Sequence, residues 1–164
     1  MNIVKKIVQV LSWICYLFVF IYVIVCVPII FKYKPLVVLT GSMEPTFKTG
    51  SIIYYKEVSQ EDIKIGDIIT FKLNDSFVSH RVNNIDNYLY ETKGDANNTV
   101  DATRIKYSDI VGKDLNFNIP YLGYYVKFIN EHMYLLIFVA IILITDFLLS
   151  NLSFNKKKED VVNE

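Results

Sequence analysis

Residues 68–82 read IITFKLNDSFVSHRV, two runs rich in β-branched and aromatic residues on either side of Asn74 and Asp75. Short runs of this kind, bounded by turn formers, are typical of β-strands. Similar runs occur at residues 51–55 (SIIYY) and 88–92 (YLYET). Turn formers punctuate the whole stretch at Gly50, Gly66-Asp67, Asn74-Asp75, Asn83-Asn84 and Lys93-Gly94-Asp95. The pattern predicts a mainly β domain of antiparallel strands within residues 32–132.

Two long apolar segments lie on either side of this β-rich region. Residues 7–31 carry no charged side chain, and at about 1.5 Å per residue they exceed the roughly 30 Å of a bilayer's hydrocarbon core. Residues 133–149 carry one acid, Asp146, and lie at the lower length limit for a span. Buried core helices are the alternative, but the middle segment is too small to wrap two of them. We therefore predict membrane-spanning helices at residues 7–31 and 133–150.

The first apolar segment has a second alternative, a cleavable signal peptide. Lys5 and Lys6 followed by an apolar run resemble the start of such a peptide. Its apolar region is usually about 7 to 15 residues long and precedes a cleavage site of small residues. Residues 7–31 are longer and no such site follows, so an uncleaved anchor is the better interpretation.

Basic residues outside the two spans predict an orientation. Lys5 and Lys6 precede the first span, and residues 156–158 are three lysines that follow the second. Under the positive-inside rule, residues 1–6 and the polar tail at residues 151–164 are cytoplasmic, and residues 32–132 lie outside. Lys32 and Lys34 on the outer side weaken this argument. From residue 155 onward the composition predicts disorder.

Charge and cysteine content exclude several classes of function. The chain has 17 basic and 17 acidic residues, a balance that creates no field attracting a nucleic acid. Its two cysteines, Cys15 and Cys26, both lie in the first apolar segment. The β-rich region therefore has no disulfide, no thiol nucleophile and no thiolate metal site.

Two side chains could perform hydrolysis without a metal or a thiol, which requires a hydroxyl nucleophile and a base. His80 shares a strand face with Val78 and Val82, so by itself it fits a core histidine as well as a base. His132 stands at the mouth of the second span, as an interfacial residue would. Ser42, in the sequence LTGSMEPT, fits a turn or a helix N-cap as well as a nucleophile.

Four segments occur in order along the chain: GSMEPT at residues 41–46, GDIITF at residues 66–71, SHRV at residues 79–82, and KGDANN at residues 93–98 followed by Asp101. Together they resemble the Ser-His branch of signal peptidase I, peptidase family S26. The segment GSMEPT at residues 41–46 resembles the nucleophile box of that family, and GDIITF at residues 66–71 resembles the following strand box. SHRV at residues 79–82 is similar to the base box, and KGDANN at residues 93–98 with Asp101 is similar to the acidic box. The resemblance covers residues 41–101, and the apolar segments on both sides agree with the family's layout.

The resemblance implies a role for each site residue. Ser42 would attack the scissile carbonyl, and His80 would take its proton and deliver it to the leaving amine. Of the two acids in the acidic box, it favours Asp101 as the partner of the imidazole, with Asp95 supporting the site. The Ser42 N–H and the Thr40 hydroxyl would form the oxyanion hole. Neither a metal nor another cofactor is expected.

The resemblance also implies a substrate and a location. The chain would be a membrane-bound serine endopeptidase that removes signal peptides from preproteins, cleaving after small residues. Its partners would be these preproteins and membrane lipid, with the secretion translocon or accessory subunits as open possibilities. It would be a multi-pass protein of the cell membrane or the endoplasmic reticulum. A membrane-anchored β domain that binds a partner or a cell-wall component without catalysis is the alternative.

The resemblance also sets this chain apart from the main bacterial branch, which uses a lysine where His80 stands. A lysine must be desolvated to lose its proton near neutral pH, whereas imidazole has a pKa of about 6.5 before any perturbation. The base of this chain should therefore need less burial. Replacement of His80 by lysine is expected to abolish activity.

Overall fold

A computed structural model describes residues 3–162 of the chain, with side chains through residue 151. The described residues form two compact units. One unit is residues 25–128, and the other combines the residues before 25 with those after 128.

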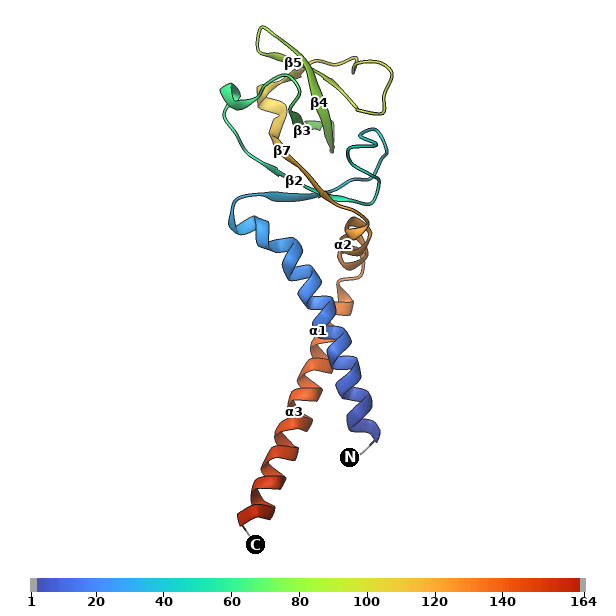
Figure 1. The fold of residues 1–164 in the computed structure, drawn as a ribbon, viewed down its shortest axis with the longest axis vertical. Coiled ribbons are helices and arrows are strands. Elements are labelled where there is room, and N and C mark those ends of the chain that lie inside the picture. Colours follow the sequence, from blue (N-terminus) through green and yellow to red (C-terminus); the bar gives the residue numbers. More distant parts are fainter. Residues whose placement is uncertain (1–2, 163–164) are drawn as a thin grey trace. The chain divides into compact units, whose positions relative to one another are not determined.

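The unit of residues 25–128 is built on one seven-stranded antiparallel sheet (Figure 1). The strand order is β1-β2-β7-β3-β4-β5-β6, and this sheet confirms the predicted mainly β domain. The strands are β1 Lys34–Val37, β2 Ile52–Lys56, β3 Ile68–Leu73, β4 Ser76–Asp86, β5 Leu89–Lys93, β6 Ile105–Lys106 and β7 Ile110–Ile119. Two short 3-10 helices, Gln60–Asp62 and Tyr107–Asp109, lie in the connections.

The four strands predicted from sequence correspond to β2, β3, β4 and β5, but one predicted turn is wrong. The pair Asn83-Asn84 lies within β4, which continues to Asp86. The register between β4 and β5 shifts between Val82 and Asn84, so a bulge accommodates the asparagines without ending the strand. The sequence did not predict β7, because its apolar residues are interrupted by glycine, lysine, aspartate and asparagine.

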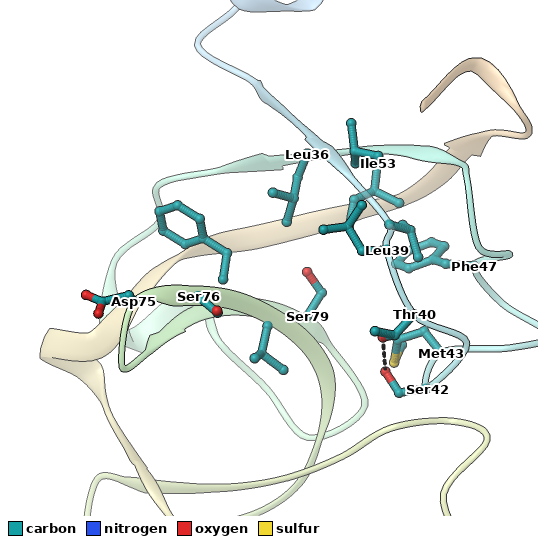
Figure 2. Close-up of a pocket in the computed structure, with 14 residues that line it drawn as sticks. Leu36, Leu39, Thr40, Ser42, Met43, Phe47, Ile53, Asp75, Ser76 and Ser79 are labelled. Carbon is teal, nitrogen blue, oxygen red and sulfur yellow. Dashed lines mark hydrogen bonds between the residues drawn. The ribbon is translucent and has the colours of Figure 1, made fainter. Parts of the chain in front are cut away.

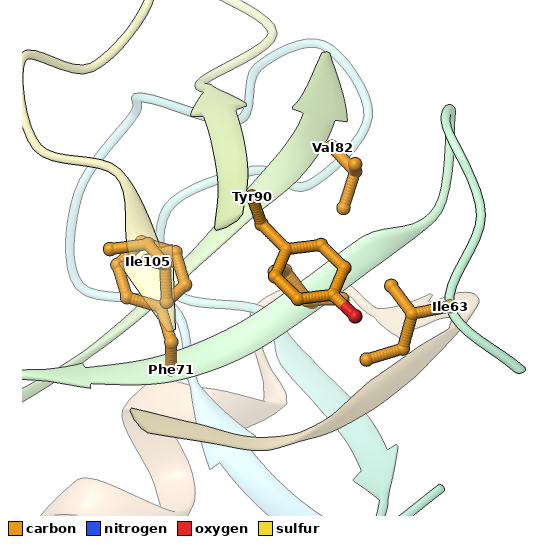
Figure 3. Close-up of a cluster of buried hydrophobic side chains, with 6 residues drawn as sticks. Ile63, Phe71, Val82, Tyr90 and Ile105 are labelled. Carbon is orange, nitrogen blue, oxygen red and sulfur yellow. The ribbon is translucent and has the colours of Figure 1, made fainter. Parts of the chain in front are cut away.

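The main core of this unit lies on the face of β4 that His80 shares. Val82 is buried together with Phe71, Tyr90 and Ile105 (Figure 3). Val78, which is partly buried, packs against this cluster. Full burial of a side chain of this size stabilises the fold by about 1.5–3 kcal/mol. A second core cluster, of Met43, Phe47, Ile53 and Ile68, anchors the loop that carries Ser42.

Three α-helices complete the part of the chain that the structure describes: α1 Ile3–Ile30, α2 Leu122–Glu131 and α3 Tyr134–Val162. Residues 3–30 and 134–151 are each long and apolar enough to cross a membrane, so the predicted apolar helices on both sides of the β domain are confirmed. The disorder expected from residue 155 is wrong for the backbone through Val162, where α3 ends. No glycine or proline follows Tyr134, and lysine and glutamate are good helix formers.

Candidate active site

Ser42, His80 and Asp101 form a continuous hydrogen-bonded series in the β unit. Ser42 Oγ lies 3.1 Å from His80 Nε2, and His80 Nδ1 lies 2.6 Å from Asp101 Oδ2. An ionised carboxylate accepts hydrogen bonds only, so Asp101 selects the tautomer with its proton on Nδ1. Nε2 then accepts a hydrogen bond from the Ser42 hydroxyl.

His80 sits in the middle of β4 and pairs with Ile69 of β3. The residue is 8% exposed, and the edge of its ring meets the Phe71 ring with 6.3 Å between the two centroids. Packing on the apolar face of the sheet therefore holds the imidazole plane. This placement satisfies both interpretations left open by the sequence, since the histidine is a core residue that also contacts the serine.

Thr92 on β5 holds Asp101 in place. Its hydroxyl donates to Asp101 Oδ2 at 2.7 Å, and its carbonyl oxygen accepts the Asp101 N–H at 2.8 Å. Thr92 is fully buried, so hydrogen bonds from a strand residue hold the carboxylate in place, although Asp101 itself lies in the loop after β5. The sequence did not single out Thr92, because a β-branched residue in a strand is expected whatever its partner.

The Ser42 loop is attached to the acidic box by a close backbone contact. The Ala96 N–H donates to the Ser42 carbonyl oxygen at 2.9 Å. A β-carbon on Gly94 would lie 2.6 Å from the same oxygen, closer than van der Waals contact allows. Gly94 is therefore required for the approach of the two loops, and this contact aligns Ser42 with the base.

Asp95, the other acid of the box, binds Arg81 and not the imidazole. Its two oxygens accept hydrogen bonds of 2.8 and 2.7 Å from Arg81 Nε and Nη2, and Oδ2 also accepts one from the Thr46 hydroxyl. The Arg81 guanidinium holds the pKa of Asp95 below its usual range. Arg81 in turn donates to the Gly66 carbonyl at 2.8 Å. Asp95 thus links the Ser42 loop to the strand that carries His80.

Thr40 lies beside the nucleophile, with Oγ1 3.4 Å from Ser42 Oγ. The Ser42 N–H has no acceptor among the described residues. The two groups expected to form the oxyanion hole, the Ser42 N–H and the Thr40 hydroxyl, thus lie near the Ser42 hydroxyl.

A cleft of about 470 Å³ opens next to Ser42 (Figure 2). Apolar side chains form most of its wall, and the exceptions include Thr40, Ser42 and the hydroxyls of Ser76 and Ser79 on β4. The apolar lining residues are Leu36, Val37, Val38, Leu39, Met43, Phe47, Ile53, Phe77 and Val78. The sequence did not identify these residues, since they come from four separate segments that only the folded sheet brings together.

Comparison with known proteins identifies the family of this chain. The family model described as signal peptidase, peptidase S26, matches residues 10–107. The chain belongs to this family. The match confirms the resemblance, and it includes the hydrogen-bonded series of Ser42, His80 and Asp101.

Relatives within the signal peptidase family come from bacteria and from eukaryotes. Signal peptidase I W of Bacillus subtilis is 36% identical over 99 residues, which are 57% of this chain and 52% of that protein. The signal peptidase complex catalytic subunit SEC11 of Scheffersomyces stipitis is 39% identical over 113 residues, which are 60% of this chain and 66% of that protein. The chain thus spans between half and two thirds of the length of these two relatives.

Proposed function

We propose that this chain is a serine endopeptidase that removes signal peptides from exported preproteins. The observation that carries the proposal is the series of hydrogen bonds from Ser42 through His80 to Asp101, found in a member of the signal peptidase family. A hydroxyl, an imidazole and a carboxylate in this order are the parts of a serine-protease triad.

In the proposed mechanism His80 acts first as base and then as acid. Nε2 removes the Ser42 proton as Oγ attacks the scissile carbonyl, and the imidazolium then protonates the leaving amine. Asp101 stabilises the imidazolium and keeps Nδ1 protonated. The Ser42 N–H and the Thr40 hydroxyl would donate to the oxyanion. Asp95 acts as a positioning residue through Arg81 and Thr46.

The cleft supports a preference for an extended, mainly apolar peptide. Its wall includes apolar side chains of β1, an edge strand of the sheet, and an extended peptide can pair its backbone with a strand edge. Shallow apolar pockets near Ser42 would favour small side chains at the cleavage site.

The two apolar helices support a membrane location. We infer that both span the bilayer, with both termini cytoplasmic and the β unit on the extracytoplasmic side, as the lysine distribution favours. A signal peptide occupies the same bilayer, so anchoring brings enzyme and substrate together. The SEC11 relatives are named as catalytic subunits of a complex, which supports accessory subunits as partners.

Cleavage of a labelled preprotein by the full chain in detergent tests this function. The wild type should release a signal peptide, and Ser42→Ala and His80→Ala should each release none. Ser42→Ala should also retain the thermal stability of the wild type. Unchanged cleavage by Ser42→Ala would refute the proposal. A protein that only binds its partner would lose nothing from the same substitution.

A further inference from the structure

Three hydrogen-bonding side chains run across the sheet from its interior to the cleft. Asp114 on β7 is 5% exposed, and its Oδ2 accepts a hydrogen bond of 2.8 Å from the Thr70 hydroxyl on β3. Thr70 is fully buried, and its Oγ1 lies 2.7 Å from Ser79 Oγ on β4. Ser79 lines the cleft that also contains Ser42 (Figure 2). The proposed catalytic series uses none of these three residues.

Asp114 is an unusual residue for a sheet interior. Its Oδ1 is buried and has no hydrogen-bond partner among the described residues. An ionised carboxylate in such a place loses its hydration without compensation. Burial therefore raises the pKa of Asp114 to about 7, although the hydrogen bond from Thr70 opposes the shift. Both the charged and the neutral form are populated near neutral pH.

The charged groups on the surrounding strands are engaged elsewhere or lie away from Asp114, whereas the titratable side chain of Tyr55 shares its face of the sheet. Lys113 precedes Asp114 on β7, so its side chain leaves the opposite face of the strand, and its ammonium lies 2.7 Å from Asp67. Tyr55 lies across from Asp114 on β2. The remaining groups are Lys56 on β2, whose ammonium lies over the Tyr33 ring, the exposed Lys72 on β3, and Arg81 on β4, which is paired with Asp95. Thr70 is thus the polar contact of Asp114 within the described residues.

The protonation state of Asp114 determines which way the hydrogen bonds point. When Asp114 is ionised, Thr70 must donate to it, so Ser79 donates to Thr70 and presents only lone pairs to the cleft. When Asp114 is protonated, a proton on Oδ1 would have no acceptor, whereas a proton on Oδ2 can be donated to Thr70. Thr70 then donates to Ser79, and the Ser79 O–H is free to point into the cleft.

We propose that Asp114 acts through Thr70 to set the polarity of Ser79, and that Ser79 binds a backbone N–H of the substrate peptide. This inference rests on the proposed function. The Ser42 N–H and Thr40 hydroxyl supply donors for the scissile carbonyl, so the N–H groups of the peptide that enter the cleft need acceptors. Ser79 meets that need while Asp114 is charged. Protonation of Asp114 reverses the chain, so that one Ser79 lone pair accepts from Thr70 and the hydroxyl presents an O–H and a single lone pair to the cleft.

Peptide affinity should therefore depend on pH independently of His80. The test uses the full chain in detergent with Ser42→Ala, and a fluorescent peptide that spans a signal-peptide cleavage region and has no group titrating between pH 6 and 8.5. We expect the dissociation constant to rise about threefold to tenfold as the pH falls from 8 to 6, because the hydrogen bond from the peptide N–H to Ser79 is weakened. Ser79→Ala and Thr70→Val, each added to Ser42→Ala, should bind weakly with little dependence on pH. Ser76→Ala, a matched control on the same strand and cleft, should retain the dependence.

The Ser79→Ala variant distinguishes this inference from a purely structural role of Asp114. Asp114 stays buried in Ser79→Ala, so the pH dependence of thermal unfolding should persist in that variant. The pH dependence of peptide binding should disappear from it. A dissociation constant that does not change with pH, or one whose change survives Ser79→Ala, would overturn this inference while wild-type cleavage still supports the peptidase. Absence of both cleavage and binding would overturn the proposed function and this inference with it.

Discussion

A β-carbon on Gly94 would lie 2.6 Å from the Ser42 carbonyl oxygen, so the acidic box and the nucleophile loop meet at a position that only glycine can occupy. The contact is between backbone atoms, and a side chain cannot rotate away from it. The Ala96 N–H closes the same junction by donating to that oxygen at 2.9 Å. The position of the nucleophile therefore depends on a residue that takes no part in the chemistry.

Replacement of Gly94 by alanine should displace the Ser42 loop. A shift of about 1 Å at the reacting atoms can cost about 10²-fold in rate, so kcat for peptide cleavage should fall by about that factor. Gly66→Ala is the matched control, because a β-carbon there meets nothing within 4 Å although the φ of 94° makes it strained. The control should lose stability and keep its kcat. Equal kcat values for wild type and Gly94→Ala would show that the loop adapts.

The two acids of the box should differ sharply in their effect on turnover. Asp101→Asn can present an amide N–H to His80 Nδ1 and so stabilise the tautomer that carries its proton on Nε2. This change lowers kcat by about 10⁴-fold in a serine protease of this design. Asp95→Asn leaves the contact between His80 and Asp101 in place. It should lower kcat less than tenfold and lower the melting temperature, since the Arg81 and Thr46 contacts weaken. Steady-state kinetics and thermal unfolding of both variants measure the difference. Similar losses of kcat would assign Asp95 a direct role.

The sequence predicted the strands and candidate residues well where the signal is local. The run at residues 77–82 alternates, and the structure has β4 there with Val82 and His80 on one buried face. The sequence did not predict features that depend on contacts between distant segments. The partnership of Thr92 with Asp101, the walls of the cleft and the strand β7 all depend on which segments the sheet brings together. Residues 110–119 contain too many polar residues to be recognised as a central strand, although β7 lies between β2 and β3.

The pH dependence of stability should reveal Asp114. Its folded-state pKa of about 7 lies above the ordinary aspartate pKa of 3.8, so the folded protein holds a proton that the unfolded chain releases between these two values. Stability should therefore fall as the pH rises from about 4 to 7 and stay low above 7, by an amount on the order of 4 kcal/mol for the full shift. Asp114→Asn has no such proton, so its free energy of unfolding relative to wild type should increase over that range. Denaturant unfolding at pH 5 and pH 8 measures this, and a constant difference between the two proteins would contradict it.

Thr40 offers the most direct test of the oxyanion hole. Its hydroxyl lies 3.4 Å from Ser42 Oγ and on the exposed side of the site, so valine preserves the shape and removes only the donor. Loss of one such donor costs about 2.7 to 4 kcal/mol of transition-state stabilisation, or about 10² to 10³ in kcat. KM should change little, because the charge develops only after binding. Thr40→Ser keeps a hydroxyl and should keep most of the turnover. Full turnover by Thr40→Val would remove Thr40 from the mechanism. The second donor to the oxyanion, beside the Ser42 N–H, would then come from another part of the cleft or from the substrate itself.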